Sequence, residues 1–220
     1  MKITKAFARL TTEMWKSSSS SGINNGIHDP SSFRREIGTF APKFMGFDQH
    51  DSQEFLLYAL DGIHTELNQK DPNPQITYKD IEEENISAKE RSERCWRFYL
   101  SKDNSLITDL FLGQFRSTLK CTQCEHESVI FEPFWVVSVP LAKDTVDLQE
   151  CLELFVRAET LDGEEMPKCE ACKERRRCIK WYSFERWPPV LVIHLKRFSG
   201  SYRTKLSNMI QTPLKALDLR

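Results

Sequence analysis

Two short motifs decide the fold of this chain: Cys121-Thr-Gln-Cys124, the first knuckle, and Cys169-Glu-Ala-Cys172, the second knuckle. In each knuckle two residues separate the cysteines, a spacing that lets both thiolates bind one metal ion. Chance spacing or a redox-active dithiol are the alternatives, but a second copy in one chain favours a metal. Four protein thiolates complete a tetrahedral zinc site and leave no position open for water. The sequence therefore predicts one structural Zn²⁺. Its ligands would be Cys121, Cys124, Cys169 and Cys172.

The composition is that of a chain with a sizeable core and almost no net charge. The 220 residues include 31 Lys plus Arg and 32 Asp plus Glu, which gives a formal net charge of -1. A chain of this length can form one large domain or two small ones. Because the net charge is near zero, no overall field would draw the chain to nucleic acid or to an anionic membrane. We expect neither as a partner.

The hydrophobic pattern and the cysteines indicate where the protein resides. No apolar run approaches the ~20 residues that cross a bilayer, and the first fifteen residues are amphipathic and charged rather than signal-like. Seven cysteines, four of them assigned to the metal, fit a reducing compartment better than a disulfide framework. We expect an intracellular protein, in the cytoplasm and also compatible with the nucleus. Its free thiols would be Cys95, Cys151 and Cys178.

Helical periodicity dominates the first part of the chain. A stripe with spacings of four, three and four predicts a helix that ends near Trp15; its residues are Ile3, Phe7, Leu10 and Met14. Residues 17–25 are rich in serine and asparagine and predict a flexible loop. Asp29-Pro30 then offers an N-cap and a first-turn proline for a short helix. Gly38 is expected to weaken or end that helix.

The strongest helix prediction covers residues 48–70. One face is apolar, with Phe55, Leu56, Ala59, Leu60, Ile63 and Leu67. Asp51-Ser-Gln-Glu54 has the pattern of a capping box with Asp in place of Ser or Thr, although Asp48 is a competing N-cap. Asp71-Pro-Asn-Pro74 should stop the helix. Residues 79–94 are densely charged and predict a solvated link, with an acidic partner site as the alternative.

The period changes to two after a short helix marked by Trp96, Tyr99 and Leu100. Strands are predicted at 113–120, 128–141 and 178–185, with a helix at 147–155 between them. The nearly continuous apolar run at 190–195 is typical of a central strand covered on both faces. The sequence thus predicts an α+β fold: helices first, then a sheet with a metal at its far end.

Three landmarks in one order carry a family resemblance: Gly46-Phe-Asp-Gln-His-Asp-Ser-Gln-Glu-Phe55, the two knuckles, and His194-Leu-Lys-Arg-Phe198. Together they resemble the ubiquitin-specific protease family of cysteine deubiquitinases over nearly the whole chain. Further segments look most like its small, insertion-poor branch: Asp109-Leu-Phe-Leu-Gly-Gln114, Phe134-Trp135 and Leu161-Asp-Gly163.

The resemblance implies a papain-like right-hand architecture of thumb, palm and fingers, with the zinc ribbon at the fingertips. Residues 1–220 would form a partial, incomplete catalytic domain. Within it, 1–110 would be the thumb-like helical part, and 111–220 the zinc-binding fingers and part of the palm.

The resemblance also implies catalytic parts that this sequence does not contain. The family's nucleophile lies in a cysteine box and its general base in a histidine box, and neither occurs in these 220 residues. His194 lies in an apolar strand, which is typical of a satisfied core histidine. Cys178 follows three arginines, which can lower a thiol pKa, but its alternating strand favours a packing role. We assign no catalytic residue and expect the chain by itself to be inactive.

The Asp51–Glu54 segment has two compatible interpretations. One is helix capping. The other follows from the resemblance, in which the matching Asp and Glu face the channel for ubiquitin's basic, extended C-terminal tail. Asp51 and Glu54 would then bind ubiquitin through charge-assisted hydrogen bonds. The family more often has Gln at the position of His50, so contacts specific to a glutamine do not carry over.

We expect part of a thiol hydrolase that cleaves the (iso)peptide bond after ubiquitin's C-terminal glycine, with ubiquitin and ubiquitinated proteins as partners. The alternative is a catalytically inactive ubiquitin-binding module. A third class is a zinc-ribbon nucleic-acid binder, suggested by Lys173 and Arg175-Arg-Arg177. The Glu164-Glu165 pair and the near-zero net charge argue against that class.

Overall fold

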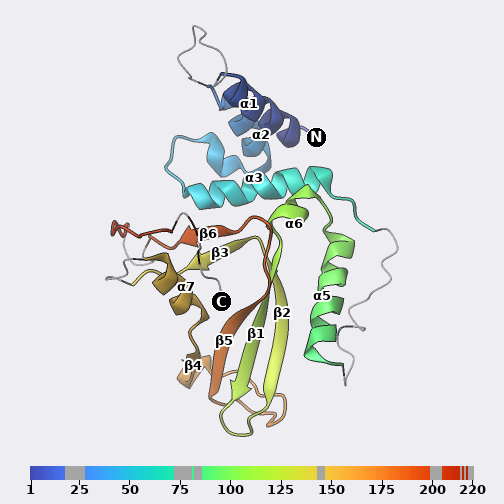
Figure 1. Cartoon of the computed structure of the whole chain (residues 1–220), viewed down its shortest axis with the longest axis vertical. Helices are drawn as coiled ribbons and strands as arrows, with labels where there is room; N and C mark the ends of the chain where they lie inside the picture. The colour runs from blue at the N-terminus through green and yellow to red at the C-terminus, as the bar shows by residue number, and fades with distance from the viewer. Residues whose placement is uncertain are drawn as a thin grey trace. The chain divides into compact units, whose positions relative to one another are not determined.

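The computed structural model describes residues 1–17, 28–71, 81, 86–142, 147–198, 205–213, 215 and 217. The chain divides into two compact units, one of Met1–Pro72 with Lys102–Asp109 and one of Asn73–Ser101 with Leu110–Arg220. Helices make up the first unit and strands are concentrated in the second (Figure 1). The predicted α+β fold is confirmed. Apart from its first residue, the predicted serine-rich loop at 17–25 lies outside the described residues.

The first unit is built on an aromatic contact between three helices. Its elements are α1 (Ile3–Ser17), α2 (Ser31–Phe40), the short 3-10 helix η1 (Pro42–Met45), α3 (Ser52–Leu67) and the start of α6 (Leu106–Phe111). The ring of Phe33 on α2 lies 5.5 Å from that of Phe7 on α1 and 6.1 Å from that of Phe55 on α3, measured between centroids. These contacts bury apolar area between helices that are separate in sequence.

The predicted helix at the N-terminus is confirmed, but its apolar stripe is covered unevenly. Ile3 is buried, whereas Phe7 and Met14 are each 42% exposed. The reason lies on α3, where Gly62 has no side chain: a Cβ at that position would meet Cδ1 of Ile3 at 2.7 Å. The helices therefore approach closely at Ile3 and cover the stripe less well toward Met14.

Gly38 was expected to weaken or end the second helix, and it does not end it. Helix α2 continues to Phe40. Gly38 is buried under Met45, and an added Cβ would lie 2.1 Å from the Met45 sulfur. Close packing thus requires a glycine, and the packing outweighs its poor helix propensity. The helix begins at Ser31, whose backbone N–H donates to the Asp29 carboxylate at 2.9 Å.

Helix α3 is shorter than the predicted range of 48–70 at both ends. Of the two candidate N-caps the structure uses Asp51, whose carboxylate accepts the Gln53 N–H at 2.8 Å. The helix ends at Leu67, before the proline-containing segment, because Asn68 turns extended. The Asn68 side chain donates to the Lys102 carbonyl at 3.0 Å and accepts the Asn104 N–H at 2.8 Å.

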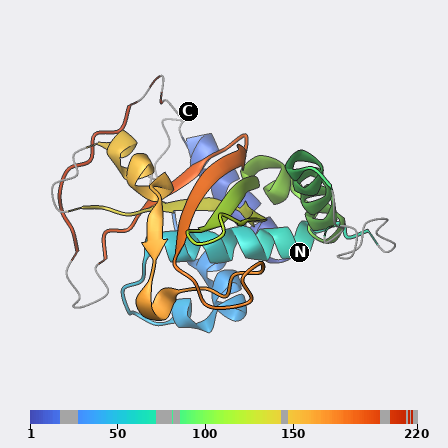
Figure 2. The same cartoon turned by 90° about the horizontal axis from the view of Figure 1, so that it is seen from below.

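The second unit contains two sheets. A four-stranded antiparallel sheet has the order β2-β1-β5-β4, with β1 (Gly113–Cys121), β2 (Glu127–Phe134), β4 (Glu159–Leu161) and β5 (Cys178–Arg186). A parallel pair joins β3 (Val136–Val139) to β6 (Val192–Leu195). The remaining elements are α5 (Ala88–Lys102), α7 (Leu148–Val156) and the 3-10 helix η2 (Gly163–Glu165). Figure 2 shows α7 beside β5.

Two strand predictions are corrected. The single strand predicted at 128–141 is broken at Trp135, and its halves β2 and β3 join different sheets. The run at 190–195 is not a central strand in the described residues, since β6 pairs with β3 and its residues are half-buried. Its apolar side chains instead meet a hydrophobic cluster on one side, with Ile193 and Leu195 against it.

The charged segment predicted as a solvated link is, from Ala88 onward, part of helix α5. Its charges pair along the helix, as between Glu90 and Arg94 at 2.6 Å. On the other face Ser92 is buried, and its hydroxyl donates to the Gln114 side-chain oxygen of β1 at 3.0 Å. The sequence shows no clear period here because the helix buries a serine rather than an apolar stripe.

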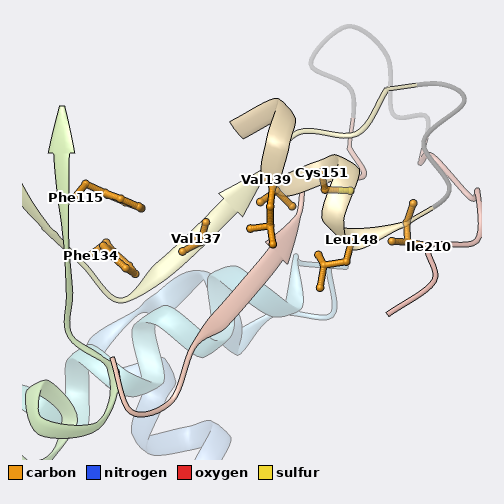
Figure 3. Close-up of a cluster of buried hydrophobic side chains, with 8 residues drawn as sticks. Phe115, Phe134, Val137, Val139, Leu148, Cys151 and Ile210 are labelled. Carbon is orange, nitrogen blue, oxygen red and sulfur yellow. The ribbon is translucent and has the colours of Figure 1, made fainter. Parts of the chain in front are cut away.

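The core of the second unit lies between β1, β3 and α7 (Figure 3). The stacked rings of Phe115 and Phe134 have centroids 4.0 Å apart. The buried members are Phe115, Phe134, Val137, Val139, Leu148, Cys151, Leu152 and Ile210. In the part of the chain that the structure describes, no helix is long and apolar enough to cross a membrane.

Glu66 of α3 fastens the start of α1. Its carboxylate accepts the backbone N–H groups of Ile3 at 3.0 Å and Thr4 at 2.9 Å, and the Thr4 hydroxyl at 2.7 Å. Burial would raise the pKa of Glu66, but hydrogen bonds from Thr4, Ile3 and Lys2 outweigh it and lower that pKa from 4.5 to about 2.

We predict that Glu66→Gln lowers the free energy of unfolding at pH 7 by about 2–3 kcal/mol, because the neutral amide replaces a hydrogen-bonded carboxylate. A depressed pKa stabilises the fold above pH 4.5, and this contribution is lost as the pH falls toward 2. Urea unfolding of both proteins across this range should show their difference shrinking.

Glu13→Gln is the matched control on α1, because Glu13 pairs with Arg9 at the surface at 2.9 Å. Its effect should stay below about 0.5 kcal/mol. A Glu66→Gln protein as stable as the control, or a deficit that persists at pH 2, would contradict the assigned role.

Candidate functional site

The first knuckle forms the turn of the β1–β2 hairpin. The Cys121 N–H donates to the His126 carbonyl at 3.0 Å, and the Glu125 N–H donates to the Cys121 carbonyl at 3.0 Å. Glu125 has a positive φ of 58°, a conformation that costs a non-glycine residue energy. The backbone conformation of the turn is therefore fixed by its surroundings at Glu125, directly after Cys124.

The second knuckle repeats this turn residue by residue. The Cys169 N–H donates to the Glu174 carbonyl and the Lys173 N–H to the Cys169 carbonyl, both at 2.9 Å. Lys173, directly after Cys172, has a φ of 60°. Two segments with different sequences thus adopt one backbone geometry, which points the two thiols of each knuckle to the same side.

The predicted ligand set comes together. The four sulfur atoms of Cys121, Cys124, Cys169 and Cys172 all lie within 4.8 Å of one another, and those of Cys124 and Cys169 are 3.6 Å apart. The turns lie at the same end of the sheet (Figure 1). The first turn is also tied to the start of β5 by Thr122, whose N–H and hydroxyl both donate to the Arg177 carbonyl, at 3.0 Å and 2.9 Å.

Opposing effects act on the thiols. Backbone N–H groups of Cys124 and Gln123 point at the Cys121 sulfur and lower the pKa of that thiol to about 6, against the effect of burial. The hydrogen bond with Cys124, burial and the contact with Cys169 raise the pKa of Cys172 to about 12. Four thiolates so close together repel one another unless a cation lies between them. The donor set fits a soft-ligand metal such as zinc.

The second candidate segment lies at the N-terminus of α3. Asp51 caps the helix, and Glu54 accepts a hydrogen bond from the Lys43 ammonium group of η1. The Lys43 ammonium also lies over the Tyr58 ring, 4.4 Å from its centroid. Glu54 is therefore half-exposed and engaged by a neighbouring cation, rather than buried as a structural carboxylate.

Sequence reasoning missed a cavity beside this segment. Its volume is about 600 Å³, and aromatic side chains such as Phe33, Phe44 and Phe55 line it. Phe47 at its edge is fully exposed. The sequence feature that could have predicted this cavity is the high density of phenylalanines between residues 33 and 55. Phe44 orders the loop before α3, with its ring 5.0 Å from that of His50.

A serine, a histidine and an aspartate also meet in the first unit, which the sequence did not indicate. The buried His64 has Nδ1 2.8 Å from the Ser105 hydroxyl and Nε2 3.3 Å from the Asp103 carboxylate. The Ser105 hydroxyl accepts the Ile107 N–H at 3.1 Å at the start of α6. Ser105 is buried, and its hydroxyl is already hydrogen-bonded to His64 and to the backbone of α6. We therefore interpret the cluster as one that stabilises the fold rather than as a catalytic triad.

The three cysteines outside the knuckles are free thiols, as predicted. Burial raises the pKa of Cys95, Cys151 and Cys178, which is the opposite of activation. The sulfurs of Cys151 and Cys178 donate to backbone carbonyls. His194 is half-buried with Nδ1 3.2 Å from the Ser138 hydroxyl, in keeping with a satisfied histidine.

With this geometry in view, the chain was compared with known proteins. The family model described as "Ubiquitin carboxyl-terminal hydrolase" matches residues 1–220. The chain belongs to this family. It is 42% identical to human Ubiquitin carboxyl-terminal hydrolase 2 over 223 residues, covering 99% of this chain and 36% of the human protein. It is 33% identical to human Ubiquitin carboxyl-terminal hydrolase 21, covering 99% of this chain and 41% of that protein.

Solved structures confirm the fold expected for a family member. The SAGA DUB module with Ubp8, Sgf11, Sus1 and Sgf73, bound to monoubiquitin, matches with a TM-score of 0.59 and 24% identity. That match covers 83% of this chain and 36% of the other. The corresponding module bound to ubiquitin aldehyde gives a TM-score of 0.58. The chain spans about a third of the length of the curated relatives first matched.

We predict that this family member, purified as residues 1–220, carries about one zinc ion per chain. Replacing both Cys169 and Cys172 by Ser should abolish metal binding and lower the melting temperature, since the second knuckle loses its ligands. Elemental analysis with a melting curve measures both effects. Cys95→Ser, outside the cluster, is the control and should retain the metal. Full zinc retention in the double variant would show that the ligand set is wrong.

Proposed function

We propose that this chain is part of a cysteine deubiquitinase that cleaves the bond after the C-terminal glycine of ubiquitin. The observation that carries the proposal is the family match over all 220 residues, supported by 42% identity to Ubiquitin carboxyl-terminal hydrolase 2. The chain would contribute ubiquitin recognition and a metal-stabilised sheet end, with ubiquitin and ubiquitinated proteins as partners. Its free cysteines support an intracellular location.

The metal we propose is a single structural Zn²⁺ held by the two knuckles. Four thiols within 4.8 Å of one another and the repeated turn geometry support this assignment. When bound, the ion would neutralise the clustered thiolates and tie the second knuckle to the end of β1. The residues 163–176 around the second knuckle contain little regular structure, namely η2 and an isolated bridge. Their position would therefore depend strongly on the metal.

We further propose that Asp51 and Glu54 contact the basic C-terminal tail of ubiquitin. Support comes from their location at a helix N-terminus and from the exposure of Glu54. In this structure the Lys43 ammonium group forms an ion pair with the Glu54 carboxylate. An ion pair between such solvent-accessible groups contributes little to stability in water. An arginine of the tail offers a planar guanidinium with two parallel donors, which a lysine lacks. Exchange of Lys43 for such an arginine is therefore physically reasonable.

Charge removal at Glu54 tests this contact. In an enzyme completed with the family's cysteine and histidine boxes, we expect Glu54→Gln to lower kcat/KM for ubiquitin substrates by about tenfold, because a charge-assisted hydrogen bond is lost. The metal content should not change. Steady-state kinetics on a fluorogenic ubiquitin amide provides the measurement.

Asp61→Asn is the control for this experiment, because Asp61 lies on the same helix and is exposed. Its kcat/KM should stay at the wild-type value. If Glu54→Gln also retains the wild-type kcat/KM, Glu54 stabilises the segment before α3 through Lys43 and does not contact ubiquitin.

The unmodified chain of residues 1–220 should not react with a ubiquitin probe that carries a thiol-reactive terminus. Burial raises the pKa of all three cysteines outside the knuckles, and the other four would be metal ligands. A cooperative melt and the expected zinc content must first establish that the sample is folded. Mass spectrometry that finds an adduct at Cys95, Cys151 or Cys178 would refute the assignment of no nucleophile.

A further inference from the structure

Cys178 is a fifth thiol beside the metal site and lies outside the proposed ligand set. It begins β5 and stands opposite Cys121, the last residue of β1. The two side chains are almost fully buried, with exposures of 1% and 2%, and Cys169 joins them in one buried cluster. The set of four mutually close sulfurs does not include Cys178. Cys178 therefore touches the site without being needed to complete its tetrahedron.

The strand register fixes how Cys121 and Cys178 face each other. The Thr122 N–H, one residue after Cys121, donates to the Arg177 carbonyl, one residue before Cys178, at 3.0 Å. In an antiparallel ladder this pattern makes Cys121 and Cys178 a non-hydrogen-bonded pair, in which the Cα atoms are about 4.5 Å apart and the side chains share one face. A disulfide accepts Cα separations of roughly 4.4–6.8 Å. The backbone thus already satisfies this requirement.

We propose that Cys121 and Cys178 form a cross-strand disulfide when hydrogen peroxide oxidises the metal-free site. The Cys121 thiolate attacks one peroxide oxygen, so that an S–O bond forms, the O–O bond breaks, and the departing hydroxide takes a proton to become water. The Cys178 sulfur then attacks the Cys121 sulfur, the S–S bond forms, and the S–O bond breaks. The hydroxyl group leaves as a second water with the Cys178 proton. Two thiols lose two electrons, and one peroxide is reduced to two waters.

One competitor is a disulfide within the first knuckle, between Cys121 and Cys124, whose sulfurs lie within 4.8 Å of each other. The other is a disulfide between Cys124 and Cys169, whose sulfurs are 3.6 Å apart. These residues belong to different knuckles, so the metal itself would hold them together. Cys121 and Cys178 instead lie on neighbouring strands, whose hydrogen-bonded ladder from Phe115 to Cys121 does not involve the metal. Their spacing persists after the metal leaves, and this preorganisation favours their reaction.

Metal binding and oxidation would be mutually exclusive, because both use the Cys121 sulfur. The metal keeps Cys121 from peroxide, and the disulfide removes one of the four ligands. The disulfide would also hold the ends of β1 and β5 together in the metal-free state. Reduction would restore the ligand and allow the metal to return.

The experiment uses residues 1–220, stripped of metal with a chelator and treated with hydrogen peroxide. Remaining thiols are alkylated, and the non-reduced tryptic peptides are mapped by mass spectrometry. Fragment ions are needed because Cys121 and Cys124 lie on one tryptic peptide. We expect a Cys121–Cys178 link and a loss of zinc binding, both reversed by dithiothreitol. A zinc-loaded sample under the same treatment should keep both thiols reduced.

The Cys178→Ala variant tells whether Cys178 is a metal ligand or the disulfide partner of Cys121. This variant should bind as much zinc as the wild type and, after the same peroxide dose, carry Cys121 as a sulfenic or sulfinic acid, because no Cys178 thiol is there to form the disulfide. Cys151→Ala, which removes a buried thiol elsewhere in the same unit, should still form the link. A wild-type map that joins Cys124 to Cys121 or to Cys169 while Cys178 is alkylated would overturn the proposal. So would loss of zinc binding in unoxidised Cys178→Ala, because Cys178 would then be a ligand. None of these readouts depends on ubiquitin.

Discussion

The second unit depends on a single constraint: four sulfur atoms, supplied by knuckles 45 residues apart, converge at one point. The first knuckle is part of a regular hairpin, so its position follows from the β1–β2 ladder. The second knuckle is closed by hydrogen bonds of its own but belongs to no named strand. A bound metal ion would convert two local turns into one long-range connection, and its free energy of binding would then contribute to the free energy of folding.

The first unit achieves order by different means. Polar and aromatic side chains determine how its helices begin and how they meet: Asp51 caps α3, Glu66 holds the start of α1, and Phe33 lies between helices. The proposed ubiquitin contact uses the first of these features. A negatively charged cap stabilises a helix N-terminus and is also placed to receive a basic peptide. One residue type thereby serves both stability and recognition.

The sequence alone predicted the knuckles, the Asp51 cap, the free thiols and the mixed fold. Each of these features leaves its signal in the spacing, periodicity or composition of the sequence. Long-range packing decided the rest. Gly38 is tolerated within a helix because the Met45 side chain packs directly against it. Ser92 is buried because its hydroxyl donates to the Gln114 side chain of β1. The strand predicted at 128–141 fails at Trp135, where pairing with β1 gives way to pairing with β6. The register that sets Cys178 opposite Cys121 likewise belongs to the sheet.

We propose one zinc ion bound by four thiolates from the two knuckles. X-ray absorption at the zinc edge of the purified chain tests this most directly, because it reports the type, number and distance of the ligand atoms. Our account predicts four sulfur atoms at about 2.3 Å and no lighter ligand. A shell with nitrogen or oxygen at about 2.0 Å, or with fewer than four sulfurs, would contradict it.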